Sequence, residues 1–413
     1  MSAEEYNERG NEYSENGQHQ QAIEEYTKAL EVDPTYIKAW YNMGVAYREL
    51  GEFHKEIDCY NKVIEIAPED TDAWYNMGVA YGELGEYSKE IDCYKKVIKI
   101  DPQYHDAWYN MGIAFRELGE YEKARGCFKQ LIKIDPEFAE AWYNMGWIYS
   151  NLGEYDKALE CYQEAVKIIP EYPDAWHNMG RIYEELEEFN RAIECYKKVI
   201  DINPKDAEVW YDMGLVYAEL DNFETEIESY QKAVEINPDF LWAWFNMGIA
   251  YTELEEHEKA LDCFLKVIEL DPEHEFAWNN IGNVYAELED HDKALECYRK
   301  AVELEPEFVN AWYNLGWVYG EQNEFNKAIE CYQKVMEIDP EDAIAWLNMG
   351  VNYGNLGEHS KALECFQQTV ELDPELADAW YNMGLAFYNL GERDRANECY
   401  DKALELDPGL ANV

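Results

Sequence analysis

A tryptophan recurs every 34 residues through this chain, and that period most constrains what it can fold into. In one 34-residue register, Tyr6 begins a series of counterparts at Trp40, Trp74, Trp108, Trp142, Trp176, Trp210, Trp244, Trp278, Trp312, Trp346 and Trp380. The register runs from Ala3 to Leu410 without an insertion. A fixed period of this length, free of gaps, is the signature of a solenoid in which each unit packs only on its neighbours.

Each unit contains two segments with the apolar spacing of a helix. In the third unit, the first segment has large side chains three and four residues apart and a glycine where a neighbouring helix can approach: Trp74, Met77, Gly78 and Tyr81. The second segment repeats that spacing at Ile91, Tyr94, Val97, Ile98 and Ile100. Gly85 is a stop between them, and Pro102 ends the second because it cannot continue the hydrogen-bond ladder. The pattern predicts a helical hairpin.

The order Trp, Met/Leu-Gly, Tyr, then Ala, Tyr/Phe and Pro resembles the tetratricopeptide repeat over all but about five residues of the chain. The resemblance implies an all-α, right-handed superhelical solenoid of twelve tandem 34-residue helix-turn-helix units. No linker or composition shift divides the chain, so we expect one continuous array with a tail at residues 411–413. Its expected repeats are residues 3–36, 37–70, 71–104, 105–138, 139–172, 173–206, 207–240, 241–274, 275–308, 309–342, 343–376 and 377–410.

No apolar run approaches the length of a membrane span, and the first residues are acidic where a secretion signal is basic, so we expect a soluble, cytoplasmic protein. The ten cysteines all occupy one register position of the second segment. Equivalent helices of stacked units pack roughly 8–10 Å apart, beyond the roughly 7 Å Cα limit of a disulfide. We therefore expect reduced thiols that fill apolar space. No Cys/His cluster has metal-ligand spacing, and no cofactor is expected.

The chain carries a formal charge of −53, with 87 acidic against 34 basic residues. A surface of this sign repels phosphate, which argues against nucleic acid and anionic membranes as partners. Part of the acidity is expected to cap helices. This applies to Glu52, Glu86, Glu120, Glu154, Glu188 and Glu256 at the start of second helices, and to Asp33, Asp101, Asp135, Asp271, Asp339, Asp373 and Asp407 before prolines. Solubility of a long solenoid accounts for most of the rest, and salt adaptation is an alternative.

Some units depart from the pattern. The first is far more polar than the others, which is typical of a terminal capping repeat. Glu56, Glu90 and Glu226 stand where a small alanine is expected, so helix contacts there are expected to be looser. The glycine between the two helices is replaced in five units, which puts the turn geometry in doubt: Glu187, Asp221, Glu255, Glu289 and Asn323.

In arrays of this family, the first helix of each unit lines a concave groove through its second, fifth, sixth, ninth, twelfth and thirteenth residues. The sixth is Asn in ten units: Asn42, Asn76, Asn110, Asn144, Asn178, Asn246, Asn280, Asn314, Asn348 and Asn382. A carboxamide both donates and accepts, so this column can pair with an extended peptide of any sequence. Alternatively, these residues pair with their own neighbours, and the sequence favours neither.

An aromatic series runs beside the asparagines, and further large apolar residues stand at the second and ninth places. The candidate contact residues are Tyr41, Tyr75, Tyr109, Tyr143, Trp147, Trp242, Phe245, Phe276, Tyr313 and Trp317. The second place is acidic in earlier units, so the later part of the groove is less acidic and more apolar. Large apolar side chains on an open face are commonly interaction sites, although these could equally pack on one another across units.

The residues argue against two uses of such arrays. The carboxylate clamp that holds chaperone C-termini needs three basic residues, but the corresponding places here read Asn7, Asn11, Asn42, Asp72 and Asn76. No phosphate loop, metal-ligand spacing or nucleophile elbow indicates an enzyme. We therefore expect a non-catalytic scaffold that binds other proteins through a basic or neutral extended peptide. Alternatives are a structural or oligomerising spacer, and a substrate-presenting subunit of a separate enzyme, because the Asn column resembles that of O-linked N-acetylglucosaminyltransferases.

The last helix has no following hairpin to cover it. Ala396, Cys399, Tyr400, Ala403 and Leu404 repeat on it at helical spacing. We expect a weak homodimer through this face, opposed at low salt by the net charge.

Overall fold

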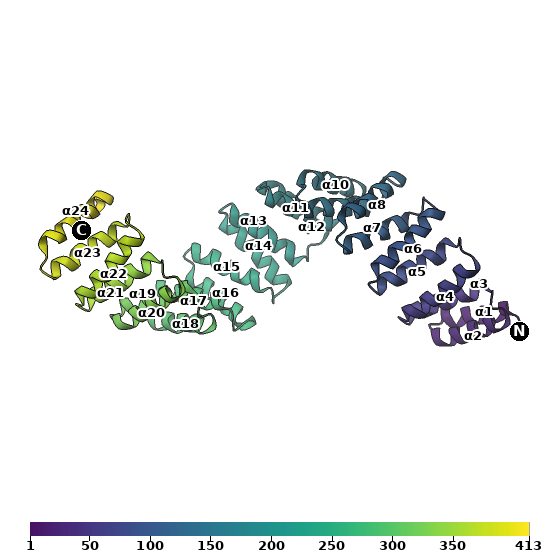
Figure 1. Cartoon of the computed structure of the whole chain (residues 1–413), viewed down its shortest axis with the longest axis horizontal. Coiled ribbons are helices and arrows are strands. Elements are labelled where there is room, and N and C mark those ends of the chain that lie inside the picture. The colour runs from purple at the N-terminus through teal and green to yellow at the C-terminus, as the bar shows by residue number, and fades with distance from the viewer. Residues whose placement is uncertain (413) are drawn as a thin grey trace. The chain divides into compact units, whose positions relative to one another are not determined.

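A computed structural model describes residues 1–412 (Figure 1). These residues form 24 α-helices and a short 3₁₀ helix, η1 (Pro408–Asn412), without a β-strand among them. The first helices of the hairpins are α1 (Ala3–Glu15), α3 (Ile37–Glu49), α5 (Thr71–Glu83), α7 (His105–Glu117), α9 (Ala139–Asn151), α11 (Pro173–Glu185), α13 (Ala207–Glu219), α15 (Leu241–Glu253), α17 (Glu275–Glu287), α19 (Val309–Glu321), α21 (Ala343–Asn355) and α23 (Ala377–Asn389).

The second helices are α2 (His19–Val32), α4 (Phe53–Ile66), α6 (Tyr87–Ile100), α8 (Tyr121–Ile134), α10 (Tyr155–Ile168), α12 (Phe189–Ile202), α14 (Phe223–Ile236), α16 (His257–Leu270), α18 (His291–Leu304), α20 (Phe325–Ile338), α22 (His359–Leu372) and α24 (Arg393–Leu406). The all-α fold of twelve helical hairpins is thereby confirmed. The helices group into two compact units, of which the first ends at Pro204 and the second begins at Lys205.

Within each unit, a second helix packs against its own first helix and against the first helix of the next hairpin. Some first helices also contact the next first helix directly, as α1 contacts α3 and α9 contacts α11 in the first unit, and α17 contacts α19 and α21 contacts α23 in the second. The first helices therefore share one face of each unit. We call it the first-helix face, and it comprises the second, fifth, sixth, ninth, twelfth and thirteenth residues of each repeat.

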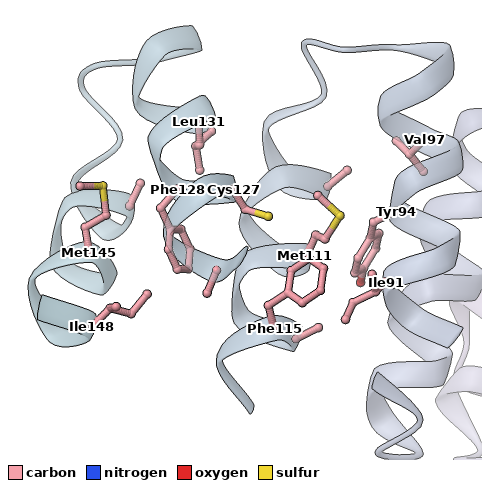
Figure 2. Close-up of a cluster of buried hydrophobic side chains, with 14 of the residues drawn as sticks. Ile91, Tyr94, Val97, Met111, Phe115, Cys127, Phe128, Leu131, Met145 and Ile148 are labelled. Carbon is pink, nitrogen blue, oxygen red and sulfur yellow. The ribbon is translucent and has the colours of Figure 1, made fainter. Parts of the chain in front are cut away.

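The core of each hairpin is built where a glycine of the first helix meets an aromatic ring of the second. A Cβ atom placed on Gly78 would lie 2.6 Å from Cε1 of Tyr94, and one on Gly112 would lie 2.7 Å from Cε1 of Phe128. Both rings are at most 1% exposed. Figure 2 shows how these rings continue into a cluster that spans α6 to α9. The predicted close approach of the two helices at this glycine is confirmed.

The recurring tryptophan ties each first helix to the turn before it. Nε1 of Trp74 donates to the carbonyl oxygen of Pro68 at 3.0 Å, and Trp108 donates in the same way to Pro102 at 3.0 Å. Equivalent bonds join the tryptophan and proline of seven other repeats, at Trp40, Trp142, Trp176, Trp244, Trp278, Trp312 and Trp380. A buried or half-buried indole N–H needs an acceptor, and the turn supplies it.

The turn between the two helices of a repeat has the same backbone geometry in all twelve repeats, whether or not its left-handed residue is glycine. Gly85 has φ +69° and Glu255 has φ +58°, and both lie in the left-handed region. Both turns are closed by the same backbone bond, because Glu86 N–H donates to the Tyr81 carbonyl and Glu256 N–H to the Tyr251 carbonyl, each at 2.9 Å. The five non-glycine residues therefore preserve the turn, at the cost of a conformation that disfavours a Cβ.

The expected capping roles of the repeated acids are wrong in detail. The glutamates at the second-helix N-cap, such as Glu52 and Glu86, make no side-chain cap hydrogen bond and pair with a lysine three residues later. The aspartates before proline stand at the C-cap of the second helix. There Asp101 Oδ1 accepts from the backbone N–H of Gln103 at 2.9 Å, which is an Asx-turn. The glutamate carboxylates therefore pair with lysines and the aspartate carboxylates form Asx-turns, and neither group makes the expected cap hydrogen bond.

All ten cysteines are buried and free. Burial raises the pKa of Cys127 to about 12, so its thiol stays protonated and packs as a small apolar group. Among the described residues, no helix is long and apolar enough to cross a membrane.

Candidate functional site

The asparagine column of the first-helix face lies at the contacts between successive first helices. Nine of its ten members are half-buried, and Asn144 is buried. In four repeats, Nδ2 donates to the hydroxyl of the tyrosine at the fifth place of the preceding repeat. These pairs are Asn76 with Tyr41, Asn110 with Tyr75, Asn178 with Tyr143 and Asn246 with Tyr211, at 2.6 to 3.1 Å.

Other members of the column pair locally. Nδ2 of Asn144 and of Asn382 each donates to the backbone carbonyl four residues earlier, at 2.8 Å. Asn280 accepts a 3.5 Å bond from Nδ2 of Asn283. Most amide nitrogens of the column thus already donate to a neighbouring group. Peptide binding by the column stays a proposal.

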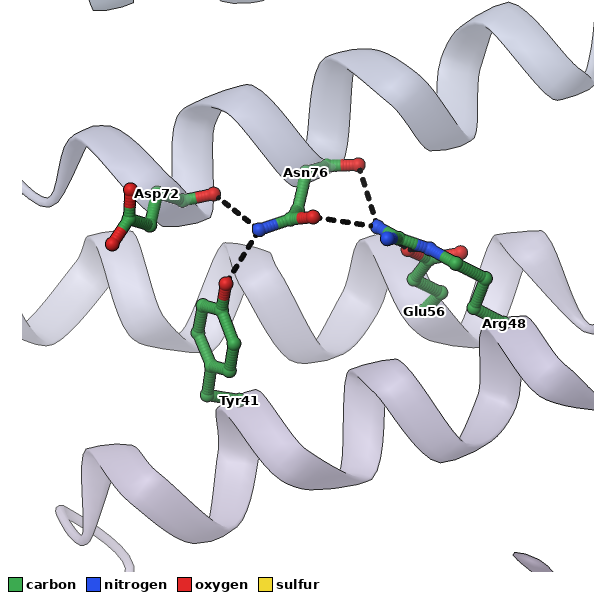
Figure 3. A network of polar contacts seen from close by, with 5 residues as sticks. All are labelled: Tyr41, Arg48, Glu56, Asp72 and Asn76. Atoms are coloured by element: carbon green, nitrogen blue, oxygen red, sulfur yellow. Dashed lines mark hydrogen bonds and ion pairs between the residues drawn. The ribbon is translucent and has the colours of Figure 1, made fainter.

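Arginine joins the column in two repeats. Nη2 of Arg48, in the last turn of α3, donates to Oδ1 of Asn76 at 2.9 Å and pairs with Oε1 of Glu56 at 2.5 Å (Figure 3). Nη1 of Arg116 donates to Oδ1 of Asn144 at 2.6 Å. In these repeats the amide accepts from an arginine on one side while its nitrogen donates on the other.

The tyrosines at the fifth place also stack on aromatic rings. The Tyr75 ring centroid lies 5.7 Å from that of Tyr94 and 5.2 Å from that of Tyr104. Tyr41, Tyr109, Tyr143 and Tyr313 make comparable contacts with the second helix of their own hairpin. Each of these rings is half-buried, so only part of it is open to a partner.

The two extra tryptophans differ in exposure. Trp147 is half-buried, with its ring 5.9 Å from Tyr121 and under the guanidinium of Arg116 at 5.1 Å. Trp317 is 49% exposed and touches His291 at 6.3 Å between ring centroids. Packing across repeats therefore covers the first tryptophan and leaves much of the second in solvent.

An exposed aromatic cluster lies on α15 to α19 of the second unit. Trp242 and Phe276 are 54% and 49% exposed, and His274 between them is buried. The His274 ring lies 5.7 Å from Trp242, 5.0 Å from Phe245 and 6.1 Å from Phe276. Phe276 in turn lies 5.0 Å from Phe308. We call these five residues the aromatic cluster, and it brings three of the sequence-predicted contact residues together.

Open hollows lie on the first-helix face of both units, and one of about 230 Å³ between α9 and α11 is lined by residues that include Trp147, Asn178 and Arg181. Two others are larger, and one lies in each unit. The first, of about 520 Å³, is lined by Glu4, Asn7, Glu8, Asn11, Tyr36, Ile37, Lys38, Tyr41, Asn42, Asp70 and Asp72. The second, of about 620 Å³, is lined by Asn279, Asn280, Asn283, Asn310, Tyr313, Asn314, Asp342 and Ile344. The first has four carboxylates in its wall, whereas the second has one.

Both hollows contain the same amide network. Nδ2 of Asn42 donates to Oδ1 of Asn7 at 3.1 Å and of Asn11 at 2.9 Å. In the second hollow, Asn314 donates to Asn279 at 3.0 Å and to Asn283 at 2.9 Å, from identical register positions. Asn stands at both the fifth and the ninth place only in these two repeats, and this repetition is the signal in the sequence for these hollows.

The acidic residues at the second place of early repeats line the edge of the first-helix face. Asp72, Asp106 and Asp174 are exposed, and Glu140 is half-buried. Each lies in the first turn of its helix, where its charge is compatible with the helix dipole. These carboxylates give the first unit a negative edge beside the tyrosine and asparagine columns.

The three glutamates that replace alanine are buried instead of loosening the packing. Glu56 is 0% exposed, Glu90 7% and Glu226 5%. Arg48 pairs with Glu56, but loss of hydration raises the pKa of Glu90 and of Glu226 to about 7. The sequence showed that a glutamate replaces alanine in these three repeats. It did not show that only Glu56 has an arginine beside it.

The last helix is covered more than expected. Ala396, Cys399 and Ala403 are at most 5% exposed, while Leu404 is 36% exposed and Tyr400 is half-buried. Three of the five expected contact residues therefore face the protein interior. Homodimerisation through α24 stays a prediction that concerns Tyr400 and Leu404.

Family models of the tetratricopeptide repeat match residues 37–70, 71–104, 139–172, 10–51, 112–153, 180–221, 239–307, 93–126, 161–194 and 207–240. Together these matches run from residue 10 to residue 307. A model of the cilia and flagella-associated protein 70 C-terminal domain matches residues 276–413. No curated protein matches the chain.

Solved structures with similarity include MamA, at 28% identity over 40% of this chain and 98% of MamA, with a TM-score of 0.38. YrrB, described as a TPR protein with an unusual peptide-binding site, is 30% identical over 44% of this chain and 94% of YrrB, with a TM-score of 0.40. The Cut9–Hcn1 hetero-tetramer of the APC/C is 14% identical over 97% of this chain and 92% of that chain, with a TM-score of 0.42. On the repeat models and the helix pairs together, the chain belongs to the tetratricopeptide repeat family.

Proposed function

We propose that this chain is a non-catalytic scaffold that binds an extended, basic or neutral peptide segment of another protein on its first-helix face. The observation that carries the proposal is the pair of open hollows on that face, each lined by asparagines and bordered by exposed side chains. Open, polar hollows with a few aromatic edges suit a peptide backbone better than a small molecule. Family membership supports the same class of function, because tetratricopeptide repeats are protein-interaction modules.

Charge supports a basic or neutral segment. The chain has a formal charge of −53, and the first hollow has Glu4, Glu8, Asp70 and Asp72 in its wall. Carboxylates on an open face attract cationic segments and repel acidic ones, and salt screens this effect. In the second unit the hollow is less acidic, and exposed Trp242 and Phe276 supply apolar contact area on the same face.

The proposal is tested with two fluorescent peptides of equal length, one rich in Lys and Arg and one with Asp and Glu in those places. Binding of each to the full chain is measured by anisotropy at low and at high ionic strength. We expect the basic peptide to bind more tightly and to lose affinity as salt rises. Equal affinity at both salt concentrations, or tighter binding of the acidic peptide, contradicts the proposal.

One observation favours the spacer alternative, in which copies of the chain associate. Leu385, Tyr388 and Leu404 are 43%, 54% and 36% exposed on the last two helices. Sedimentation of the intact protein and of a Leu404→Glu variant over a range of concentrations tests this. Concentration-dependent dimers that the substitution abolishes support the alternative, and a monomer at every concentration contradicts it.

A further inference from the structure

One register position on the second helices holds either alanine or glutamate. It is alanine in nine repeats, and each of these alanines is at most 1% exposed: Ala22, Ala124, Ala158, Ala192, Ala260, Ala294, Ala328, Ala362 and Ala396. It is glutamate in three repeats, at Glu56, Glu90 and Glu226, and each glutamate is at least nine-tenths buried. Burying an ionised carboxylate at such a position destabilises the fold, unless a cation or several hydrogen bonds compensate for its lost hydration.

Repeat two shows how the chain itself compensates such a carboxylate. Arg48 donates from Nε to Oε1 of Glu56 at 2.7 Å, while its Nη2 reaches both that oxygen and Oδ1 of Asn76. The side chain of Arg48 is 29% exposed and that of Glu56 is 0% exposed. The partly exposed guanidinium therefore lies against the buried carboxylate, and Figure 3 shows the two side chains next to each other.

Repeats three and seven have the same acceptors without the arginine. Gly82 and Ala218 occupy the register position of Arg48. The Cβ position of Gly82 lies 3.0 Å from the carboxyl carbon of Glu90, so Glu90 points to the place where an arginine side chain would begin. Oε2 of Glu226 has no hydrogen-bond partner, and the same holds for Oε2 of Glu56, whose other oxygen binds Arg48.

The second acceptor of the arrangement is also repeated. Asn110 and Asn246 donate Nδ2 to Tyr75 and Tyr211, as Asn76 donates to Tyr41. In repeat two this donation turns Oδ1 of Asn76 toward Arg48. In repeats three and seven the asparagine also interacts with the tyrosine of the second helix, Tyr94 or Tyr230, next to the buried glutamate.

The groups that surround these carboxylates do not neutralise them. The Tyr94 hydroxyl hydrogen-bonds Glu90 and supplies a neutral donor, while the nearby Glu83 carboxylate opposes ionisation. Glu253 acts in the same direction on Glu226, which lies next to Tyr230. Loss of hydration is the largest influence on both groups, and it raises the pKa of each.

We propose that Glu90 and Glu226 are two receptor sites for arginine side chains of the bound partner. The inference rests on the proposed function, because it assigns a side chain to a segment on the first-helix face. Arginine fits better than lysine, because in repeat two both Nε and Nη2 of Arg48 bind the buried carboxylate, which a single ammonium cannot do. The two sites lie in different units and take different arginines.

The test uses three acetylated pentapeptide amides in a glycine background, whose central residue is arginine, lysine or citrulline. Citrulline keeps the shape of arginine and removes its charge. Each is titrated into the full chain by calorimetry at pH 7 in buffers of different ionisation enthalpy, which reports affinity and proton release. Because both glutamates have a pKa of about 7, binding of a cation releases about half a proton per site.

We expect the arginine peptide to bind at least about tenfold more tightly than the citrulline peptide, with the lysine peptide between them. Glu90→Gln with Glu226→Gln removes the proton release and the preference for charge. Gly82→Arg with Ala218→Arg supplies the guanidinium from within the chain, as in repeat two, and blocks binding as well. Absence of proton release with the intact chain, or release that persists in the glutamine variant, overturns the inference.

A longer basic peptide separates this inference from the proposed function. If that peptide binds the intact chain and the double glutamine variant equally, the arginine sites are wrong and the peptide-binding face stands. If the longer peptide does not bind but the arginine pentapeptide releases protons, the sites stand and the proposed function fails.

Discussion

Nδ2 of Asn110 donates a 3.0 Å hydrogen bond to the hydroxyl of Tyr75, which lies 35 residues earlier on the preceding first helix. The same bond joins repeats at Asn76, Asn178 and Asn246. It fixes the position of one first helix against the next and turns the amide oxygen away from the tyrosine. The hydrogen bonds of the asparagine column therefore stabilise the contact between successive repeats, whether or not the column also binds a peptide.

Removing this bond should destabilise the array. We expect Asn110→Ala to lower the free energy of unfolding by about 1 kcal/mol, because the half-buried Tyr75 hydroxyl loses its donor. Asn382→Ala is the control, since Asn382 donates only to the Asp378 carbonyl of its own helix and should cost less. Urea denaturation of both variants followed by circular dichroism gives the comparison, and equal losses contradict a cross-repeat role.

Two glycines of the fourth repeat should respond in opposite directions to alanine. A Cβ on Gly112 would meet two atoms of the Phe128 ring at 2.7 Å, whereas one on Gly126 would meet nothing within 4 Å. Gly112→Ala should destabilise by roughly 1–3 kcal/mol through overpacking. Gly126→Ala should stabilise by up to about 1 kcal/mol, because alanine is the better helix former. Thermal unfolding decides, and a stabilised Gly112→Ala variant shows that the ring can move aside.

The left-handed turns predict a stabilising change. Glu289 has φ +59° in the place where other repeats have glycine. Glu289→Gly should raise the free energy of unfolding by about 1 kcal/mol, and Gly119→Glu should lower it by about as much. The melting temperatures of the two variants should move in opposite directions. A lower melting temperature for Glu289→Gly would mean that the glutamate side chain stabilises the turn by another route.

The period of the sequence was enough to predict the helices, because every hairpin repeats one apolar pattern and its glycine, tyrosine and proline act locally. The partners across repeats could not be predicted in the same way. Whether Asn110 meets a peptide or Tyr75 depends on how far successive first helices rotate, and no single repeat encodes that angle. The sequence also could not show that Arg48 reaches Glu56, since this contact depends on side-chain conformation.

Stability should depend on pH through the buried glutamates. Burial, with Glu253 nearby, raises the pKa of Glu226 from 4.5 to about 7, so the folded state binds the proton more tightly than the unfolded chain. Its contribution is fully present below pH 4.5 and is lost as pH rises through 7, by about 3 kcal/mol.

Glu226→Gln should therefore be more stable than the intact chain at pH 8, with a difference that shrinks as pH falls toward 4.5. Denaturation at several pH values measures it, and Glu228→Gln on the exposed side of the same helix is the control. A difference that does not change with pH shows that Glu226 remains ionised in the folded protein.

The central claim is that the first-helix face binds a basic segment. The most direct test compares a variant with reversed charges on first helices with one that has reversed charges on second helices. Asp72→Lys with Asp106→Lys changes exposed residues on α5 and α7, while Asp58→Lys with Asp92→Lys changes exposed residues on α4 and α6. Both pairs alter the net charge equally, so long-range attraction falls alike in the two variants. Affinity for the basic peptide, measured at fixed ionic strength with circular dichroism confirming the fold, should fall much further in the first variant than in the second. An equal loss in the two variants would contradict the claim, because binding would then follow net charge and not the first-helix face.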